Sequence, residues 1–179
     1  MVIVDIFDAA RDGTYKEFLS FYSGKVNLTD KHTGLNLLCQ VLCNDKNSDD
    51  KLKIIEFLIS EGIDINFKDK KMDRNALHTF YFGVWRPNPD YMFEVTKLLV
   101  ENGIDINAKD KYNAIPLKYA VTLTKHPTEM IRSTYEYLLI QGSDYKNKDV
   151  FDKSCIDYSN EYSWRNDVIK IIEEIEDGS

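Results

Sequence analysis

The sequence predicts an all-α fold, an α-solenoid of about five helical units, and three observations lead to this prediction. The stretch EGIDINFKD (61–69) returns almost unchanged as NGIDINAKD (102–110), and related pentapeptides end at Asp30 and Asp149. A glycine lies six or seven residues before each of the four aspartates that end these stretches. The segments before the glycines carry their apolar residues on one helical face. Repeats of this length are typical of stacked helical arrays.

The repeat length sets the unit boundaries. Successive aspartates of the motif are 39, 41 and 39 residues apart. We take each aspartate as the end of one unit. Because stacked units of this kind share one continuous core, we predict a single domain over residues 1–179. The predicted units are about 1–30, 31–69, 70–110, 111–149 and 150–177.

The second helix of each unit is predicted from the segment before its glycine. Ahead of Gly142, apolar residues recur at helical spacing, and the final segment repeats this pattern with Val168, Ile171, Ile172 and Ile175. A helix commonly ends where the next residue turns left-handed, which glycine does at little cost. We therefore expect second helices to end at Gly24, Gly62, Gly103 and Gly142.

A turn and a first helix are predicted after each aspartate of the motif. Asn113 and Asp152 stand where the turn needs a left-handed residue, a conformation that both residue types tolerate. Pro116 stands where a helix accepts proline, in its first turn. The equivalent apolar positions of these helices are Leu37, Leu77, Leu117 and Ile156.

At these positions the sequence resembles the ankyrin repeat family. NALH (75–78) and IPLK (115–118) are similar to the family's T-P-L-H tetrad, and LLVENGIDINAKD (98–110) is similar to its L-L-x-x-G-A-D-x-N-A segment. The resemblance covers nearly the whole chain. It implies a rigid array of helix pairs that binds other proteins, in which His78 ties its helix to a loop.

The sequence departs from the family pattern in the length of its units, which exceed the usual 33 or so residues. The additional residues lie between the two helices of a unit, as CNDKNSDD (43–50), GVWRPNPDY (83–91) and TLTKHPTE (122–129). Insertions in repeat arrays usually lie on one face. We expect these lengthened connections to form a row.

Composition narrows the classes of partner. The formal net charge of -7 argues against nucleic acid and against anionic membranes, which both attract basic surfaces. Asp5 interrupts the apolar start too early for a secretory signal, and no apolar stretch is long enough to span a bilayer. Three cysteines, an odd number, favour a reducing cytoplasmic location over a disulfide framework. We expect no cofactor.

No catalytic constellation emerges from the spacing of the reactive residues. His32, His78 and His126 fall in different units, and no nucleophile and base can be named together. The sequence therefore predicts a protein that is not an enzyme. One metal pattern remains as an alternative, because DKNSDDKLKIIE (45–56) places Asp45, Asn47 and Glu56 as a calcium loop would, although Asp50 replaces the glycine of its turn.

Aromatic residues at the insertions and loop tips are the candidate binding residues. Tryptophan, tyrosine and arginine are the usual anchors of protein interfaces, since they bury a large area and keep a polar group. The alternative for Trp85 is packing on its own helix. The predicted protein-binding residues are Phe82, Trp85, Arg86, Tyr91, Tyr112, Phe151 and Tyr162.

The function predicted from the resemblance is non-enzymatic protein binding. Small ankyrin proteins of this kind include immunity proteins, which neutralise a toxin by direct binding, and an acidic binder would suit a basic toxin. The alternatives are a general scaffold or adaptor and a binder modulated by calcium through residues 45–56.

Overall fold

A computed structural model describes residues 2–178, and within this range it contains ten α-helices, two short 3₁₀ helices and no β-strand. The prediction of an all-α fold is confirmed. The helices are α1 (Ile6–Asp12), α2 (Tyr15–Phe21), α3 (Leu37–Val41), α4 (Ser48–Ser60), α5 (Ala76–Gly83), α6 (Pro89–Glu101), α7 (Pro116–Leu123), η1 (Thr128–Ile131), α8 (Arg132–Ile140), α9 (Cys155–Glu161), η2 (Ser163–Arg165) and α10 (Asn166–Asp177).

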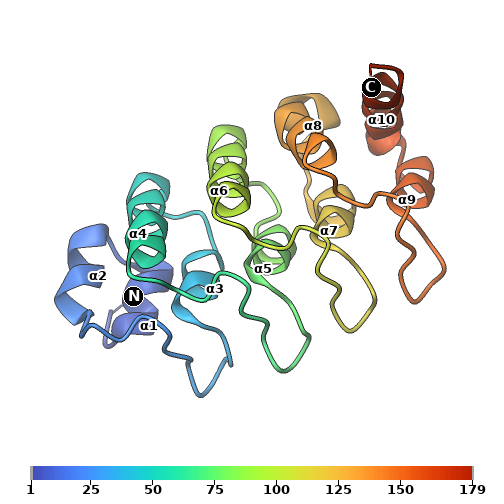
Figure 1. The fold of residues 1–179 in the computed structure, drawn as a ribbon. Coiled ribbons are helices and arrows are strands. Elements are labelled where there is room, and N and C mark those ends of the chain that lie inside the picture. Colours follow the sequence, from blue (N-terminus) through green and yellow to red (C-terminus); the bar gives the residue numbers. More distant parts are fainter. Residues whose placement is uncertain (1, 179) are drawn as a thin grey trace.

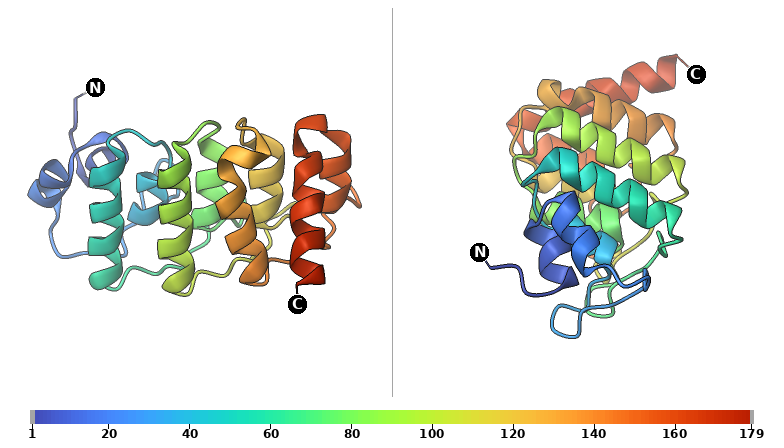
Figure 2. Two further views of the ribbon diagram at one scale, coloured as in Figure 1. Left: turned by 90° about the horizontal axis from the view of Figure 1, so that it is seen from above. Right: turned by 90° about the vertical axis from the view of Figure 1, so that its left-hand side faces the viewer.

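The helices form two parallel rows (Figures 1 and 2). The inner row contains α1, α3, α5, α7 and α9, and each of these helices contacts the next. The outer row contains α2, α4, α6, α8 and α10 in the same order. Long loops project beyond the inner row on one side, as Figure 1 shows. The two sides of this layer are therefore different surfaces, one made of loops and short helices and the other of longer helices.

Local sequence signals explain where the helices begin and end. The Asn75 side chain caps α5, and Ser154 caps α9 through a reciprocal box with Asp157. Pro116 is the first residue of α7, as predicted. Gly24, Gly62, Gly103 and Gly142 have φ between 79° and 89°, the left-handed conformation expected of them. The last three come directly after the caps of α4, α6 and α8, whereas α2 already ends at Phe21, so the predicted end of that helix at Gly24 was wrong.

The core lies between the two rows. Leu37, Leu77 and Leu117 are fully or almost fully buried, whereas their equivalent in the last unit, Ile156, is only partly buried. The outer helix α10 closes the array with one apolar face (Val168, Ile171 and Ile172) and exposes Glu173 and Glu174 on the other. Each unit thus buries its apolar face against its neighbours.

The connections between inner and outer helices lie along one edge of the array (Figure 2, left). They are shorter than predicted, because α4 starts at Ser48 and α6 starts at Pro89, inside two of the predicted insertions. Among the residues described, no helix is long and apolar enough to cross a membrane.

Candidate protein-binding surface

An asparagine of the repeated motif connects each unit to the next. The side-chain amide of Asn66 donates to the Gly103 carbonyl at 2.9 Å, and its oxygen accepts the Asp105 N–H at 2.7 Å. Asn27 and Asn107 make the same pair of bonds to their following units. The repeated motif therefore fixes the spacing of the units, which holds the surface above them rigid.

The aspartates that end the motif organise the projecting loops. Asp110 is buried, and its carboxylate accepts the backbone N–H groups of Tyr112 and Ala114 and the Tyr119 hydroxyl. Burial acts to raise the pKa of Asp110, but these hydrogen bonds outweigh it, and the pKa is lowered. Arg74, at the start of the same unit, reaches this carboxylate at 3.3 Å. Asp149 and Tyr158 repeat the bond between carboxylate and hydroxyl, at 2.6 Å.

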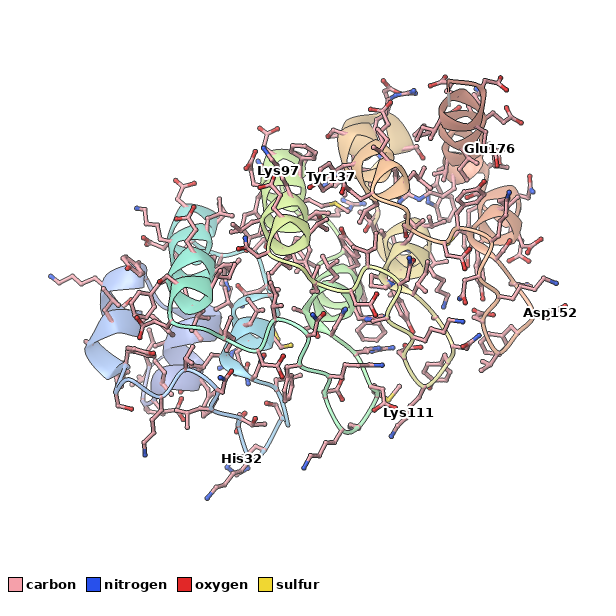
Figure 3. All side chains as sticks on the ribbon, viewed as in Figure 1. His32, Lys97, Lys111, Tyr137, Asp152 and Glu176 are labelled. Atoms are coloured by element: carbon pink, nitrogen blue, oxygen red, sulfur yellow. The ribbon has the colours of Figure 1, made fainter. Side chains whose placement is uncertain are left out.

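The loop tips also bond to one another through the backbone. The Lys111 N–H donates to the Met72 carbonyl, and the Val150 N–H donates to the Tyr112 carbonyl, both at 2.9 Å. Figure 3 places Lys111 and Asp152 at the tips of successive loops. Because adjacent tips are joined, their side chains keep fixed positions relative to one another.

His78 serves as a structural bridge. One ring nitrogen lies 2.8 Å from the Asn75 side-chain oxygen, and the other lies 2.9 Å from the Ala114 carbonyl of the next unit. Burial lowers the pKa of His78 to about 4, so the ring is neutral at physiological pH. The ring therefore joins its helix to a loop, as the resemblance implies, and that loop belongs to the following unit.

The connections at the edge of the array form the predicted row, and hydrogen bonds join them. The Lys125 N–H donates to the Trp85 carbonyl at 2.6 Å, and the His126 ring lies 2.6 Å from the Pro87 carbonyl. The Thr128 hydroxyl donates to the Trp164 carbonyl at 2.9 Å. The lengthened connections are thus part of the packed structure.

A buried arginine holds the last part of this row. Arg165 has no exposed surface, and its guanidinium donates to the carbonyls of Val121, Thr124 and His126 at the end of α7. A cation is favoured at a helix C-terminus, where unpaired carbonyls gather. Sequence reasoning did not select Arg165, because arginine is seldom fully buried without a carboxylate partner.

Of the seven predicted binding residues, three lie together at the end of α5 or just beyond it. Phe82 is partly exposed, and the Arg74 guanidinium stacks 3.9 Å from its ring centre. Trp85 exposes 57% of its surface, while its indole N–H donates to the Phe82 carbonyl at 3.0 Å. Arg86 is exposed. Trp85 thus combines the two alternatives, since it is tethered to its own helix and its ring faces solvent.

Three further predicted residues are separate from this group. Tyr112 and Phe151 lie at successive loop tips and are exposed. Tyr162 is half-buried and stacks on Trp164, with ring centres 4.8 Å apart. Arg74, in the loop that precedes α5, stacks on Phe82, so the base of a projecting loop is in contact with the end of α5.

Tyr91 corrects the prediction. It lies within α6 and is only 4% exposed, with its ring packed edge-on against Phe80. The sequence places it at the end of an insertion, but the helix begins two residues earlier and turns this side chain into the core. Tyr91 is therefore unavailable as an anchor on the binding surface.

A hollow beside Phe82 adds residues that sequence reasoning missed. It has a volume of about 260 Å³ and lies between the second and third units, with Leu35, Met72 and Phe82 as apolar lining and Lys71 and Arg74 as basic lining. Leu35 and Arg74 share one signal, since each lies five residues after the aspartate that ends a motif. We call the surface made by this hollow, Trp85, Arg86 and the tips at Tyr112 and Phe151 the inner face.

The calcium pattern in residues 45–56 is not assembled. Because α4 begins at Ser48, Asp49 and Glu56 are separated by about two helical turns instead of closing around one point. Across residues 2–178 no three potential metal-binding side chains of His, Cys, Asp or Glu converge. We therefore do not propose calcium binding.

The cysteines lack the features of a nucleophile. Burial raises the pKa of Cys39 and of Cys155 to about 12, so both thiols are protonated near neutral pH. Cys43 is partly exposed, and burial raises the pKa of its thiol as well.

No protein-family model matches the sequence, and no curated protein is recognisably similar to it. The function is therefore inferred from the geometry of the inner face.

Proposed function

We propose that the chain is an ankyrin-type α-solenoid that binds another protein through its inner face and catalyses no reaction. Paired helices in two rows and left-handed glycines after the outer helices support the family. The projecting loops, joined at their tips, support it as well. The five predicted units remain part of this proposal.

One observation carries the assignment of the binding surface. Phe82 is a partly exposed aromatic ring at the edge of an apolar hollow, on a scaffold held by inter-unit hydrogen bonds. Aromatic rings on rigid backbone lose little conformational entropy on binding, and interface hot spots cluster where apolar pockets can be filled. Trp85 and Arg86 extend the same surface.

The narrower proposal is an immunity protein that neutralises a toxin by direct binding, in the cytoplasm. Three free cysteines suit a reducing compartment. The alternative is a general scaffold or adaptor, and one observation favours it. Lys71 and Lys111 are exposed on the loops of the inner face, and the exposed Asp152 beside Phe151 pairs with Lys148. This face therefore does not present the excess of negative charge that a basic toxin would seek.

The proposal is tested by capture followed by a quantitative measurement. The wild-type chain and the variants Phe82→Ala, Trp85→Ala and Ile140→Ala are immobilised, and proteins retained from native lysate are identified by mass spectrometry. Ile140 is the matched control, because it is an exposed apolar residue at the end of the outer helix α8. The dissociation constant of each purified partner is then measured by calorimetry.

We expect the alanine variants of Phe82 and Trp85 to weaken binding by about 2 kcal/mol, roughly 30-fold, and the control to change it little. Circular dichroism checks that all variants stay folded. Equal affinity of the four proteins for every captured partner would exclude the inner face.

A further inference from the structure

The net negative charge of the chain is concentrated on the outer row of helices. On the loops, Asp69, Asp110 and Asp149 are buried, whereas Lys70, Lys71 and Lys111 are exposed. Figure 3 shows Lys111 and His32 at loop tips, far from Lys97 on the outer helix α6. Exposed carboxylates on α4 and α6 include Asp49, Glu56, Asp90, Glu94 and Glu101.

These carboxylates surround two adjoining hollows between α4 and α6. One has a volume of about 230 Å³, with Leu52 and Leu98 as its apolar lining and Glu56 and Glu94 beside them. The other, of about 330 Å³, shares Leu52 and Glu94 and continues toward Asp49 and Asp90. Together they make a groove with an apolar floor and acidic walls, which we call the outer groove.

The acidic walls carry charge that the chain does not neutralise. Within residues 2–178, none of the carboxylates of Asp49, Glu56, Asp90 and Glu94 pairs with a cation. Lys97 is the basic residue in the groove, and it lies 3.9 Å from Glu101 in an exposed pair. Exposed pairs of this kind contribute little to stability. The groove therefore keeps a negative potential that attracts cations.

A second and independent feature lies in the same groove. Tyr91 lines its wider part and is 96% buried, yet its hydroxyl has no hydrogen-bond partner among the residues described. A buried hydroxyl without a partner is costly to the fold.

We propose that the outer groove docks a basic amphipathic segment of a partner protein, with its lysine or arginine side chains against Glu56 and Glu94 and its apolar side chains on Leu52 and Leu98. This site is separate from the inner face and does not depend on it. It gives the chain two binding surfaces of different charge, and a basic partner belongs on the outer one.

The test uses a fluorescent synthetic peptide, about as long as α4, that carries lysines on one helical face and leucines on the other. Its affinity for the full chain is measured by fluorescence anisotropy. The variant Glu56→Lys/Glu94→Lys is compared with Glu173→Lys/Asp177→Lys. The control makes the same change in net charge at exposed positions of α10, outside the groove.

We expect the groove variant to weaken peptide binding at least tenfold and the α10 control to weaken it less than threefold. A peptide with glutamates in place of the lysines should not bind. Equal loss in the two lysine variants would show non-specific charge attraction and overturn the proposal, as would a wild-type chain that does not bind the lysine peptide. The inner-face variants Phe82→Ala and Trp85→Ala should bind the peptide normally, which keeps this test apart from that of the proposed function.

Discussion

The amide side chain of Asn66 joins Gly103 and the residue two positions after it, so that one side chain satisfies two backbone groups of the next unit. In the fourth unit Lys146 takes the equivalent place, and its amine instead lies 3.1 Å from Glu176 on α10. Gly178, which follows α10, has a φ of -88°, so it does not make the left-handed turn whose carbonyl accepts the asparagine amide in the earlier units.

Replacement of Asn66 by alanine should lower the free energy of unfolding by about 1 to 2 kcal/mol, because two inter-unit hydrogen bonds are lost. Urea unfolding followed by circular dichroism measures this difference. The control is Asn102→Ala, which removes one exposed bond to the Leu98 carbonyl in the same helix. A loss for Asn66→Ala no larger than that of the control would contradict the linking role.

Replacement of Arg165 by methionine should cost about 3 kcal/mol or more, because three carbonyls near the end of α7 lose a buried donor. Lysine should rescue only part of this loss, since it keeps the charge but cannot reproduce the forked geometry of the guanidinium. The measurement is the midpoint of urea unfolding. The control is Arg86→Met, where the side chain is exposed and a change within about 0.5 kcal/mol is expected.

The left-handed glycines can be predicted from the sequence, whereas the contacts of Arg165 cannot. Glycine adopts the left-handed turn after a helix because it has no Cβ atom, which is a local cause. Gly62 and Gly103 therefore indicate helix ends in the sequence itself. Arg165 finds its partners 37 to 44 residues earlier in the chain, and no local pattern contains that information.

The candidate surface could likewise be predicted only in part. Trp85 stands out because a large aromatic residue occurs in a connection that could be short, and Phe82 comes directly before that connection. Tyr91 was misplaced because the start of α6 decides which way it points, and helix boundaries are the least certain feature of a sequence. The hollow that borders Phe82 needs side chains from two units, so spacing alone could not reveal it.

Stability should depend on pH through His78. Its pKa is lowered to about 4 in the folded chain, against an ordinary value near 6.5, because burial disfavours the charged ring. The unfolded chain then binds more protons between these values, so the stability contributed by the neutral ring is complete above pH 6.5 and is lost as the pH falls toward 4. The upper limit of this loss is about 3 kcal/mol.

The variant His78→Gln should flatten the dependence of unfolding free energy on pH between 6.5 and 4, whatever its effect at neutral pH. Asn102→Ala, which removes no titratable group, should leave the slope as it is. Urea unfolding at a series of pH values measures both slopes. Identical slopes for His78→Gln and the wild type would show that the ring is not held neutral by burial.

Removal of each of two buried tyrosine hydroxyls should change the free energy of unfolding, in opposite directions. The Tyr135 hydroxyl donates to the Ala120 carbonyl at 2.9 Å, whereas the Tyr91 hydroxyl has no partner in the described part of the chain. Tyr135→Phe should therefore lower the free energy of unfolding by about 1 kcal/mol, and Tyr91→Phe should raise it by a similar amount while the ring keeps its packing on Phe80. Thermal and urea unfolding of both variants measure these changes. Destabilisation by Tyr91→Phe would mean that the hydroxyl already has a partner in the free protein.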